Sequence, residues 1–205
     1  MTVTAVRKDP QALTMTLEAE FDASADRVWQ LWADPRQLER WWGPPTYPAT
    51  FTTHDLAPGS RVTYHMTGPE GDQSRGYWDI IEADAPYRLV FRDGFANADG
   101  TPNTDMPLNT ANVRIEEVGA GRTRMSIESV FPSIEAMEQV LAMGMEEGLT
   151  EAVRQIDAIL AEDERRPKKQ RHTAKRIFER LRDEHGYSGG ITIVKDYVLS
   201  RRLRH

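Results

Sequence analysis

The chain has 205 residues, of which 28% are charged and 39% are hydrophobic, and it contains no cysteine. This is the composition of a globular protein, and it excludes disulfides, cysteine-ligated zinc and thiolate catalysis. No apolar run approaches the roughly 20 residues that cross a bilayer, and the first ten residues lack the apolar segment of a secretory signal. We therefore expect a soluble, cytoplasmic protein that makes no membrane contact.

The net charge of −6 is distributed unevenly along the chain. Residues 1–161 carry 13 Lys and Arg against 25 Asp and Glu, whereas residues 162–205 carry 13 against 7. An acidic body repels nucleic acid, whereas a basic end attracts it. The sequence therefore predicts two parts, a folded domain over 1–161 and a basic linker with a short helical tail over 162–205.

The first part begins with a strand and two helices. Residues 14–21 alternate between apolar and polar, which is the period of a strand with one buried face. Ser24 is a suitable N-cap for a first helix, and Pro35 a suitable first residue for a second one. We predict that the second helix runs through Leu38 to Trp42, so the side chains of Trp41 and Trp42 should point about 100° apart. We therefore expect one of the two to enter the core and the other to lie near a cavity mouth or the surface.

Six further strands and one long helix follow. Turn residues separate segments of strand character at 50–56, 61–66, 74–82, 87–92, 109–117 and 122–131. The short connection before the last strand predicts a hairpin, so the sheet should be largely antiparallel, and the long loop over 93–107 is typical of a functional or mobile segment. After Ser133, apolar residues recur at three- and four-residue steps to about Ala161. A sheet of about seven strands and such a helix bury each other only if the sheet wraps around the helix.

An internal cavity is one explanation for two glycines on the inner face of this helix. Gly144 and Gly148 each cost about 1 kcal/mol relative to alanine, so they either let the sheet approach closely or leave room for a ligand. Tyr64 and Arg124 are candidates to orient that ligand. The predicted lining consists of inward-facing residues of the strands and helices: Trp42, Val62, Tyr64, Met66, Trp78, Leu89, Phe91, Met125, Ile127, Met137, Leu141 and Gly144.

Four stretches of the first part resemble bacterial START-like (SRPBCC) proteins related to the activator of the heat-shock-protein ATPase, a group that includes polyketide-cyclase-like members. They are FDASADRVWQLWADPRQLERWWGPP, GYWDIIEADAPYRLVF, VRIEEVGAGRTRMSIESVF and MGMEEGLTEAVRQIDAIL. The resemblance covers residues 14–160 and departs at Leu149, where the family usually has Trp. It implies an α+β helix-grip (START/Bet v-like) fold with a ligand-sized interior, but no shared catalytic set and no cofactor. The eukaryotic cochaperone of the group has an additional domain for chaperone contact, which nothing here resembles, so we do not expect chaperone contact.

The predicted function is binding of a small hydrophobic or aromatic molecule. The general acids and bases on offer are His54, His65, Asp79 and Glu128, and the alternation of the strands directs His65 and Asp79 outward. Metal-ligand spacings and phosphate loops are absent from the sequence. We therefore predict no catalytic or metal-binding residue. An enzyme of the cyclase or hydrolase type that uses the same cavity is the alternative.

The tail carries a separate resemblance. The stretch QRHTAKRIFERLRDEHGYSGGITIVKDYV predicts two short helices and is similar to the N-terminal region of insertion-sequence transposases. Because no acidic-triad nuclease follows, transposition is not expected. Lys195, Arg201 and Arg202 are candidates for contacts with nucleic-acid phosphates. The tail is either a fused remnant without an activity of its own or a weak DNA-binding element.

Overall fold

The structure, a computed structural model, describes residues 3–165 of the chain. Its eight strands are β1 (Val3–Asp9), β2 (Thr14–Phe21), β3 (Ala49–Thr53), β4 (Arg61–Thr67), β5 (Gln73–Asp84), β6 (Arg88–Ala96), β7 (Asn109–Gly119) and β8 (Arg122–Val130). They form one sheet in the order β1-β2-β8-β7-β6-β5-β4-β3. All neighbouring strands are antiparallel, as the hairpin spacing predicts.

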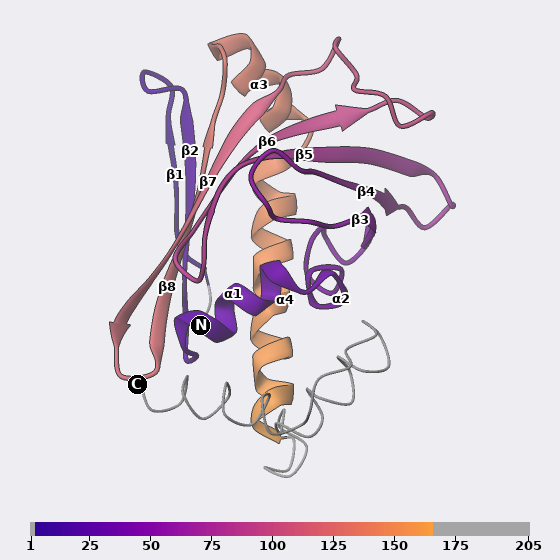
Figure 1. The fold of residues 1–205 in the computed structure, drawn as a ribbon. Helices are drawn as coiled ribbons and strands as arrows, with labels where there is room; N and C mark the ends of the chain where they lie inside the picture. The colour runs from indigo at the N-terminus through magenta and orange to yellow at the C-terminus, as the bar shows by residue number, and fades with distance from the viewer. Residues whose placement is uncertain (1–2, 166–205) are drawn as a thin grey trace. The chain divides into compact units, whose positions relative to one another are not determined.

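Four helices accompany the sheet: α1 (Ala25–Ala33), α2 (Pro35–Leu38), α3 (Ile134–Ala142) and α4 (Met145–Arg165). The predicted caps are present, because the Ser24 hydroxyl accepts a hydrogen bond from the Arg27 amide and the Ser133 hydroxyl accepts one from the Ala136 amide. Figure 1 shows the sheet curving around α4. This arrangement confirms the predicted α+β fold of an antiparallel sheet wrapped on a long C-terminal helix.

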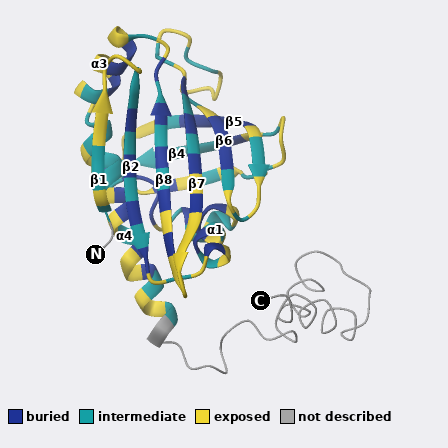
Figure 2. Ribbon diagram, turned by 90° about the vertical axis from the view of Figure 1, so that its left-hand side faces the viewer, coloured by how far each residue is buried: buried dark blue, intermediate teal, exposed yellow. Residues whose placement is uncertain are grey.

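The core lies on the concave face of the sheet. Burial alternates along β2 and β8, as expected for strands with one buried face (Figure 2). From the helix side, α4 contributes four buried residues to the main core: Ala152, Val153, Ile156 and Ile159. The largest fully buried side chains of this cluster are Trp32, Trp41, Trp78 and Phe91. The aromatic centre of the core therefore lies between α1, the turn after α2 and strands β5 and β6.

The N-terminal strand β1 is missing from the seven strands that the sequence predicts. It is an edge strand that pairs only with β2, and none of its residues is buried. An exposed edge strand has no buried face and therefore no strict alternation of apolar and polar residues. The period of two that identifies the other strands is consequently weak over Val3–Asp9.

The predicted single helix after Ser133 is in fact two helices, α3 and α4. They meet at Gly144, whose φ is +88°. This backbone conformation suits glycine and strains other residues, so Gly144 ends one helix and precedes the next. The prediction that Gly144 lies inside a continuous helix was therefore wrong, whereas Gly148 does lie inside α4.

The expected placement of the two neighbouring tryptophans holds, because Trp41 is fully buried and Trp42 lines the pocket described below, but the helical argument for it does not. Trp41 and Trp42 are 0% and 8% exposed and belong to one core cluster, with ring centroids 5.6 Å apart at an angle of 83°. Because α2 ends at Leu38 and turns follow, the helical angle of about 100° per residue does not apply to this pair. The Trp41 indole N–H donates to the Leu31 carbonyl at 3.0 Å.

The helices within residues 3–165 include none that is long and apolar enough to cross a membrane. The cytoplasmic location stays a prediction, and so does the boundary between residues 161 and 162. The predicted tail helices, with Lys195, Arg201 and Arg202, lie outside the described residues.

Candidate functional site

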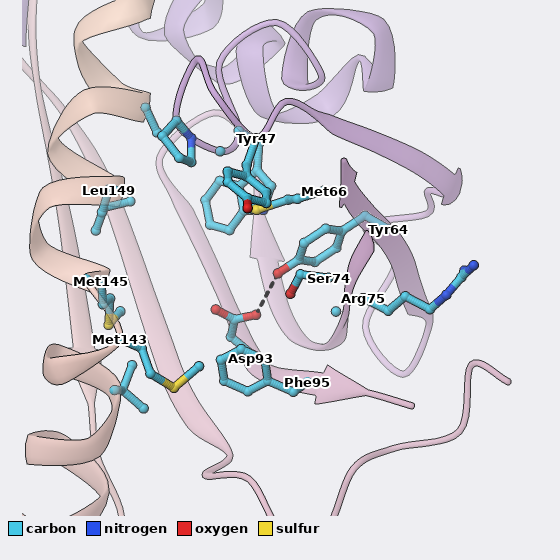
Figure 3. A pocket seen from close by; sticks show the side chains of 18 of the residues that line it. Tyr47, Tyr64, Met66, Ser74, Arg75, Asp93, Phe95, Met143, Met145 and Leu149 are labelled. Atoms are coloured by element: carbon cyan, nitrogen blue, oxygen red, sulfur yellow. Dashed lines mark hydrogen bonds between the residues drawn. The ribbon is translucent and has the colours of Figure 1, made fainter. Parts of the chain in front are cut away.

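A pocket of about 350 Å³ opens between the sheet and the junction of α3 with α4. Figure 3 shows its sheet wall, formed by β4, β5 and β6, opposite side chains of the helices. Its lining from the loop and strands is Trp42, Gly43, Pro44, Tyr47, Tyr64, Met66, Ser74, Arg75, Gly76, Asp93, Gly94, Phe95 and Asn109. Its lining from the helices and their junction is Val140, Met143, Gly144, Met145, Gly148, Leu149 and Ala152.

The polar centre of the pocket is a hydrogen bond between two strands that are not neighbours. The Tyr64 hydroxyl on β4 donates to Asp93 Oδ1 on β6 at 3.3 Å (Figure 3). The intervening strand β5 places Gly76 directly opposite Tyr64. A Cβ at Gly76 would lie only 2.5 Å from the Tyr64 Oη and Cζ atoms. The missing side chain thus allows the tyrosine ring to lie across β5 and reach Asp93.

Burial governs the electrostatics of this pair. Desolvation raises the pKa of Asp93 to about 7, although the hydrogen bond from Tyr64 and the nearby Trp78 indole favour the ionised form. Burial, reinforced by the charge of Asp93, raises the pKa of Tyr64 well above its usual value of 10. The Asp93 carboxyl therefore changes its charge near neutral pH, whereas the Tyr64 hydroxyl stays protonated and remains a donor.

Several buried polar atoms around this pair have no hydrogen-bond partner within residues 3–165. Asn109, directly opposite Asp93 on β7, is 4% exposed, and its Oδ1 atom is unpaired. The indole N–H groups of Trp42 and Trp78 are also buried without a partner in hydrogen-bonding geometry. The Trp78 indole is nevertheless close enough to Asp93 to stabilise its negative charge. Unpaired buried polar atoms are uncommon in proteins and call for an explanation.

The helix side of the pocket is apolar and partly open. Met143 is 55% exposed, and a Cβ at Gly148 would meet no atom within 4 Å. Two hydrogen bonds hold α4 against the loop after α2, because Gln155 Nε2 donates to the Gly43 carbonyl at 2.8 Å and to the Trp41 carbonyl at 3.3 Å. The pocket therefore has a polar wall within the hydrogen-bonded sheet and an apolar wall on the helix side with unfilled space.

Only four of the twelve predicted lining residues line this pocket: Trp42, Tyr64, Met66 and Gly144. Six others are fully packed in the main core: Val62, Trp78, Leu89, Phe91, Met125 and Ile127. Met137 belongs to a second apolar cluster, and Leu141 packs against that cluster. The prediction extended the cavity along the whole inner face, whereas α4 packs against much of this face and the pocket lies beside its first two turns.

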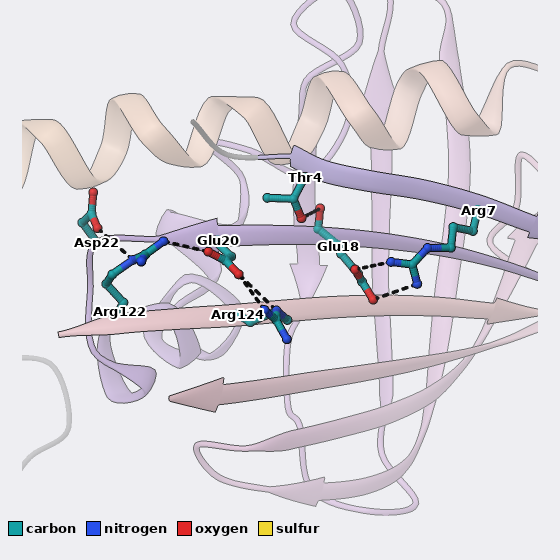
Figure 4. A network of polar contacts seen from close by, with 7 residues as sticks. All are labelled: Thr4, Arg7, Glu18, Glu20, Asp22, Arg122 and Arg124. Carbon is teal, nitrogen blue, oxygen red and sulfur yellow. Dashed lines mark hydrogen bonds and ion pairs between the residues drawn. The ribbon is translucent and has the colours of Figure 1, made fainter. Parts of the chain in front are cut away.

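Of the two polar residues predicted to orient a ligand, Tyr64 lies in the pocket and Arg124 does not. Arg124 is on the outer face, where it and Arg122 both pair with Glu20 at 2.8 Å (Figure 4). Asp79 pairs with Arg61 at 2.7 Å, as expected for an outward-facing residue.

The remaining predicted acids and bases lie outside the pocket too. His54 Nε2 lies 2.9 Å from the Trp32 carbonyl, and burial lowers the pKa of this imidazole. Glu128 accepts a hydrogen bond from Asn112. His65 is partly buried on β4 next to Tyr64. Within residues 3–165, no group of three His, Cys, Asp or Glu side chains could hold a metal ion.

Asp93 is the functional candidate that the sequence reasoning missed. It was assigned to the loop over 93–107, but β6 continues to Ala96. Leu89 and Phe91 are buried on the inner face, and one further step of two residues places Asp93 on the same face. The alternation pattern therefore contained the signal, although an acidic residue next to glycine favoured a loop.

A curved antiparallel sheet that grips a helix and leaves a ligand-sized pocket defines the helix-grip class. The chain belongs to the family described as Activator of Hsp90 ATPase homolog 1-like protein, whose model matches residues 22–161. A second model, that of the Mu-like transposase middle domain, matches residues 151–204. This match supports the transposase resemblance of the tail, although the model describes a middle domain rather than an N-terminal region.

Solved structures similar to this chain agree with the family assignment. Protein Ms6760 from Mycobacterium smegmatis is 51% identical, with a TM-score of 0.72 over 77% of this chain and 96% of that one. A protein from Arthrobacter aurescens is 48% identical, with a TM-score of 0.76 over 84% and 99%. A family member from Silicibacter pomeroyi, 21% identical with a TM-score of 0.59 over 73% and 99%, shows the likeness of fold alone. A comparison with curated proteins finds no match.

Proposed function

We propose that the protein binds a small hydrophobic or aromatic molecule in the pocket between β4–β6 and the α3–α4 junction. The observation that carries this proposal is the combination of a largely apolar wall with one half-buried polar pair, Tyr64 and Asp93. Ligand sites in proteins typically combine apolar walls with a few convergent polar groups. The volume of about 350 Å³ suits a small molecule rather than a lipid chain or a peptide.

The expected affinity is modest. Burying roughly 300 Å² of apolar ligand surface at about 25 cal/mol per Å² contributes about 7 kcal/mol, from which the cost of association must be subtracted. Binding in the micromolar range or weaker follows from these two terms. Polar contacts with Tyr64 and Asp93 would then determine which ligands are preferred.

A substitution at Gly148 tests this proposal directly. Gly148→Leu places an isobutyl side chain in the unfilled space of the pocket, whereas Ala158→Leu places the same side chain at an exposed position of α4. A panel of small aromatic compounds is screened by ligand-observed NMR, and freshly purified protein is examined by native mass spectrometry. We expect compounds that bind wild type and Ala158→Leu but not Gly148→Leu. Binding to no compound, or equal binding to Gly148→Leu, would contradict the proposal.

An enzymatic role in the same pocket is the second candidate, and the Asp93–Tyr64 pair favours it. A carboxyl group whose pKa is about 7 can both accept and donate a proton near neutral pH. Perturbed carboxyl groups of this kind occur at catalytic sites. Under this alternative, a compound that binds the pocket is converted by wild type and left unchanged by Asp93→Asn. Mass spectrometry of incubated compounds measures this difference, and unchanged compounds with wild type argue against an enzyme.

Weak DNA binding by the tail is a separate proposal, supported by the basic charge of residues 162–205 and by the Mu-like match over 151–204. Contacts with phosphates lose affinity steeply as the salt concentration rises. Fluorescence anisotropy with duplex DNA at 50 and 200 mM salt should show such a loss for the full chain. A variant that ends at Ala161 should not bind, and equal affinity of the two proteins would refute the proposal.

A further inference from the structure

Within the described part of the chain, the Asp93 carboxylate faces the pocket and has no cationic partner. Each element packed around it supplies a neutral group: Tyr64 comes from β4, Trp78 from β5 and Asn109 from β7. The helix side supplies methionine, leucine and glycine. Arg75 also lines the pocket, but its guanidinium points away from Asp93 and donates to Gln73 Oε1 at 2.8 Å (Figure 3). No ion pair within residues 3–165 includes Asp93.

Acceptor atoms of Asp93 and Asn109 lack donors within residues 3–165, although the indole N–H groups of Trp42 and Trp78 nearby also lack acceptors in good geometry. The Tyr64 hydroxyl donates to Oδ1 of the carboxylate, and within residues 3–165 no further hydrogen bond of good geometry reaches this group. The neighbouring Asn109 Oδ1 atom is a second buried acceptor without a partner. A buried carboxylate is stabilised by hydrogen bonds and by an opposite charge, and it otherwise tends to take up a proton. A ligand that offers several N–H donors and a positive charge would supply both.

The remaining surroundings also suit a cation. Aromatic rings of Trp42, Tyr47, Tyr64 and Phe95 line the same pocket as Asp93. The rings of Trp42 and Tyr64 are perpendicular to each other, with centroids 6.2 Å apart. The faces of such rings attract organic cations, with Trp the most effective. Met66, Met143 and Met145 provide polarisable apolar surface for the rest of the ligand.

We propose that the ligand of this pocket is an organic amine, bound as its ammonium ion, with the nitrogen paired to Asp93 and the apolar body packed against the aromatic rings and methionines. This inference rests on the proposed function, because it names the class of molecule that the same pocket takes. It distinguishes amines from alcohols and hydrocarbons of the same shape, which lack the positive charge.

The pH dependence of binding follows from the proposal. The ammonium ion pairs with ionised Asp93, and protonation of this carboxyl near pH 7 competes with the ligand. At pH 5.5 only a few per cent of a group with a pKa of 7 is ionised, so amine affinity should fall roughly 30-fold relative to pH 8.5. The other groups facing Asp93 do not change charge in this range, because the pKa of Tyr64 is raised far above it and Trp78 and Asn109 do not titrate.

The test compares three probes with one phenyl ring: 2-phenylethylamine, 2-phenylethanol and ethylbenzene. Their dissociation constants are measured by NMR titration with the full-length protein at pH 8.5 and pH 5.5. We expect 2-phenylethylamine to bind at least tenfold more tightly than 2-phenylethanol at pH 8.5. This preference should disappear in Asp93→Asn and persist in Asp105→Asn, which removes an equal charge at an exposed position outside the pocket.

The outcomes separate this inference from the proposed function. If the alcohol or ethylbenzene binds and Gly148→Leu abolishes that binding, but the amine shows no preference, the amine inference is wrong and ligand binding stands. If the amine preference survives in Asp93→Asn, a different group provides it and the inference is also wrong. If none of the three probes binds wild type up to its solubility limit, both proposals are overturned for ligands of this size.

Discussion

The free energy of unfolding of Asp93→Asn, measured relative to wild type, should rise as the pH is raised from acidic to alkaline values. The substitution keeps the shape of the side chain and an oxygen that accepts from Tyr64, but it removes the charge. In wild type, folding moves the Asp93 carboxyl out of water and raises its pKa from 3.8 to about 7. The folded protein therefore holds a proton that the unfolded chain releases between these two values.

The sign and size of the effect follow from linkage. Between about pH 4 and pH 7 the folded state binds more protons than the unfolded state, so raising the pH lowers the free energy of unfolding. One pH unit corresponds to about 1.4 kcal/mol, so the full cost above pH 7 is up to about 4 kcal/mol. From pH 5 to pH 8, the stability of Asp93→Asn relative to wild type should rise by about 2–3 kcal/mol.

Urea unfolding followed by tryptophan fluorescence measures this difference. All five tryptophans of the chain lie between residues 29 and 78, so the signal reports on the helix-grip domain. Titrations of wild type and Asp93→Asn at several pH values between 5 and 8.5 cancel the contributions of other groups. If the difference in unfolding free energy stays constant over this range, or falls as the pH rises, the carboxyl of Asp93 does not have a raised pKa in the folded state.

Three further substitutions test individual features. Gly144→Ala should destabilise the protein by about 1–2 kcal/mol, because the φ of Gly144 is +88°. Gly148→Ala should stabilise it by up to about 1 kcal/mol, because Gly148 lies inside α4 with free space around its Cβ. Urea unfolding measures both effects, and the reverse order would contradict a helix break at Gly144. Gly76→Ala should displace the Tyr64 ring and weaken its hydrogen bond to Asp93. A carboxyl titration by carbon-13 NMR should then find the pKa of Asp93 above about 7. An unchanged titration would contradict the close approach of the Tyr64 ring to Gly76. Trp41→Phe removes the donor to the Leu31 carbonyl and leaves a void, which should lower the free energy of unfolding by about 2–3 kcal/mol; a loss below 1 kcal/mol would contradict full burial.

The fold could be predicted from the sequence wherever one face of an element is buried. β2 alternates strictly between buried and partly buried residues, and its pattern is plain in the letters TMTLEAEF. The N-caps at Ser24 and Ser133 could also be predicted, because capping depends on a side chain that is local in the sequence. The exposed strand β1 and the break at Gly144 were not, since one lacks a buried face and the other depends on a single backbone angle.

The candidate site was predicted less well, for a physical reason. Periodicity shows which residues of a strand face inward, but it does not show where facing elements touch and where they leave a gap. Trp78 and Phe91 face inward as predicted, yet their rings lie 4.4 Å apart in the filled core. The gap depends on where the chain turns between α3 and α4, which is a tertiary property. Asp93 was missed for a different reason. The inner face of a strand is usually apolar, so the pattern does not lead one to expect a carboxyl there.

The two walls of the pocket differ in how much freedom they have. Asp93 occupies a row of directly opposed residues, Val62, Trp78, Asp93 and Asn109, that runs across four hydrogen-bonded strands. The opposite wall is a helix junction of one glycine flanked by long thioether side chains. A guest molecule would therefore meet a fixed anchor at one end and an adjustable surface at the other. Under the proposed function, the pocket would select for the charged end of a ligand and tolerate variation in its apolar part, so it would bind a series of compounds that share one terminal group.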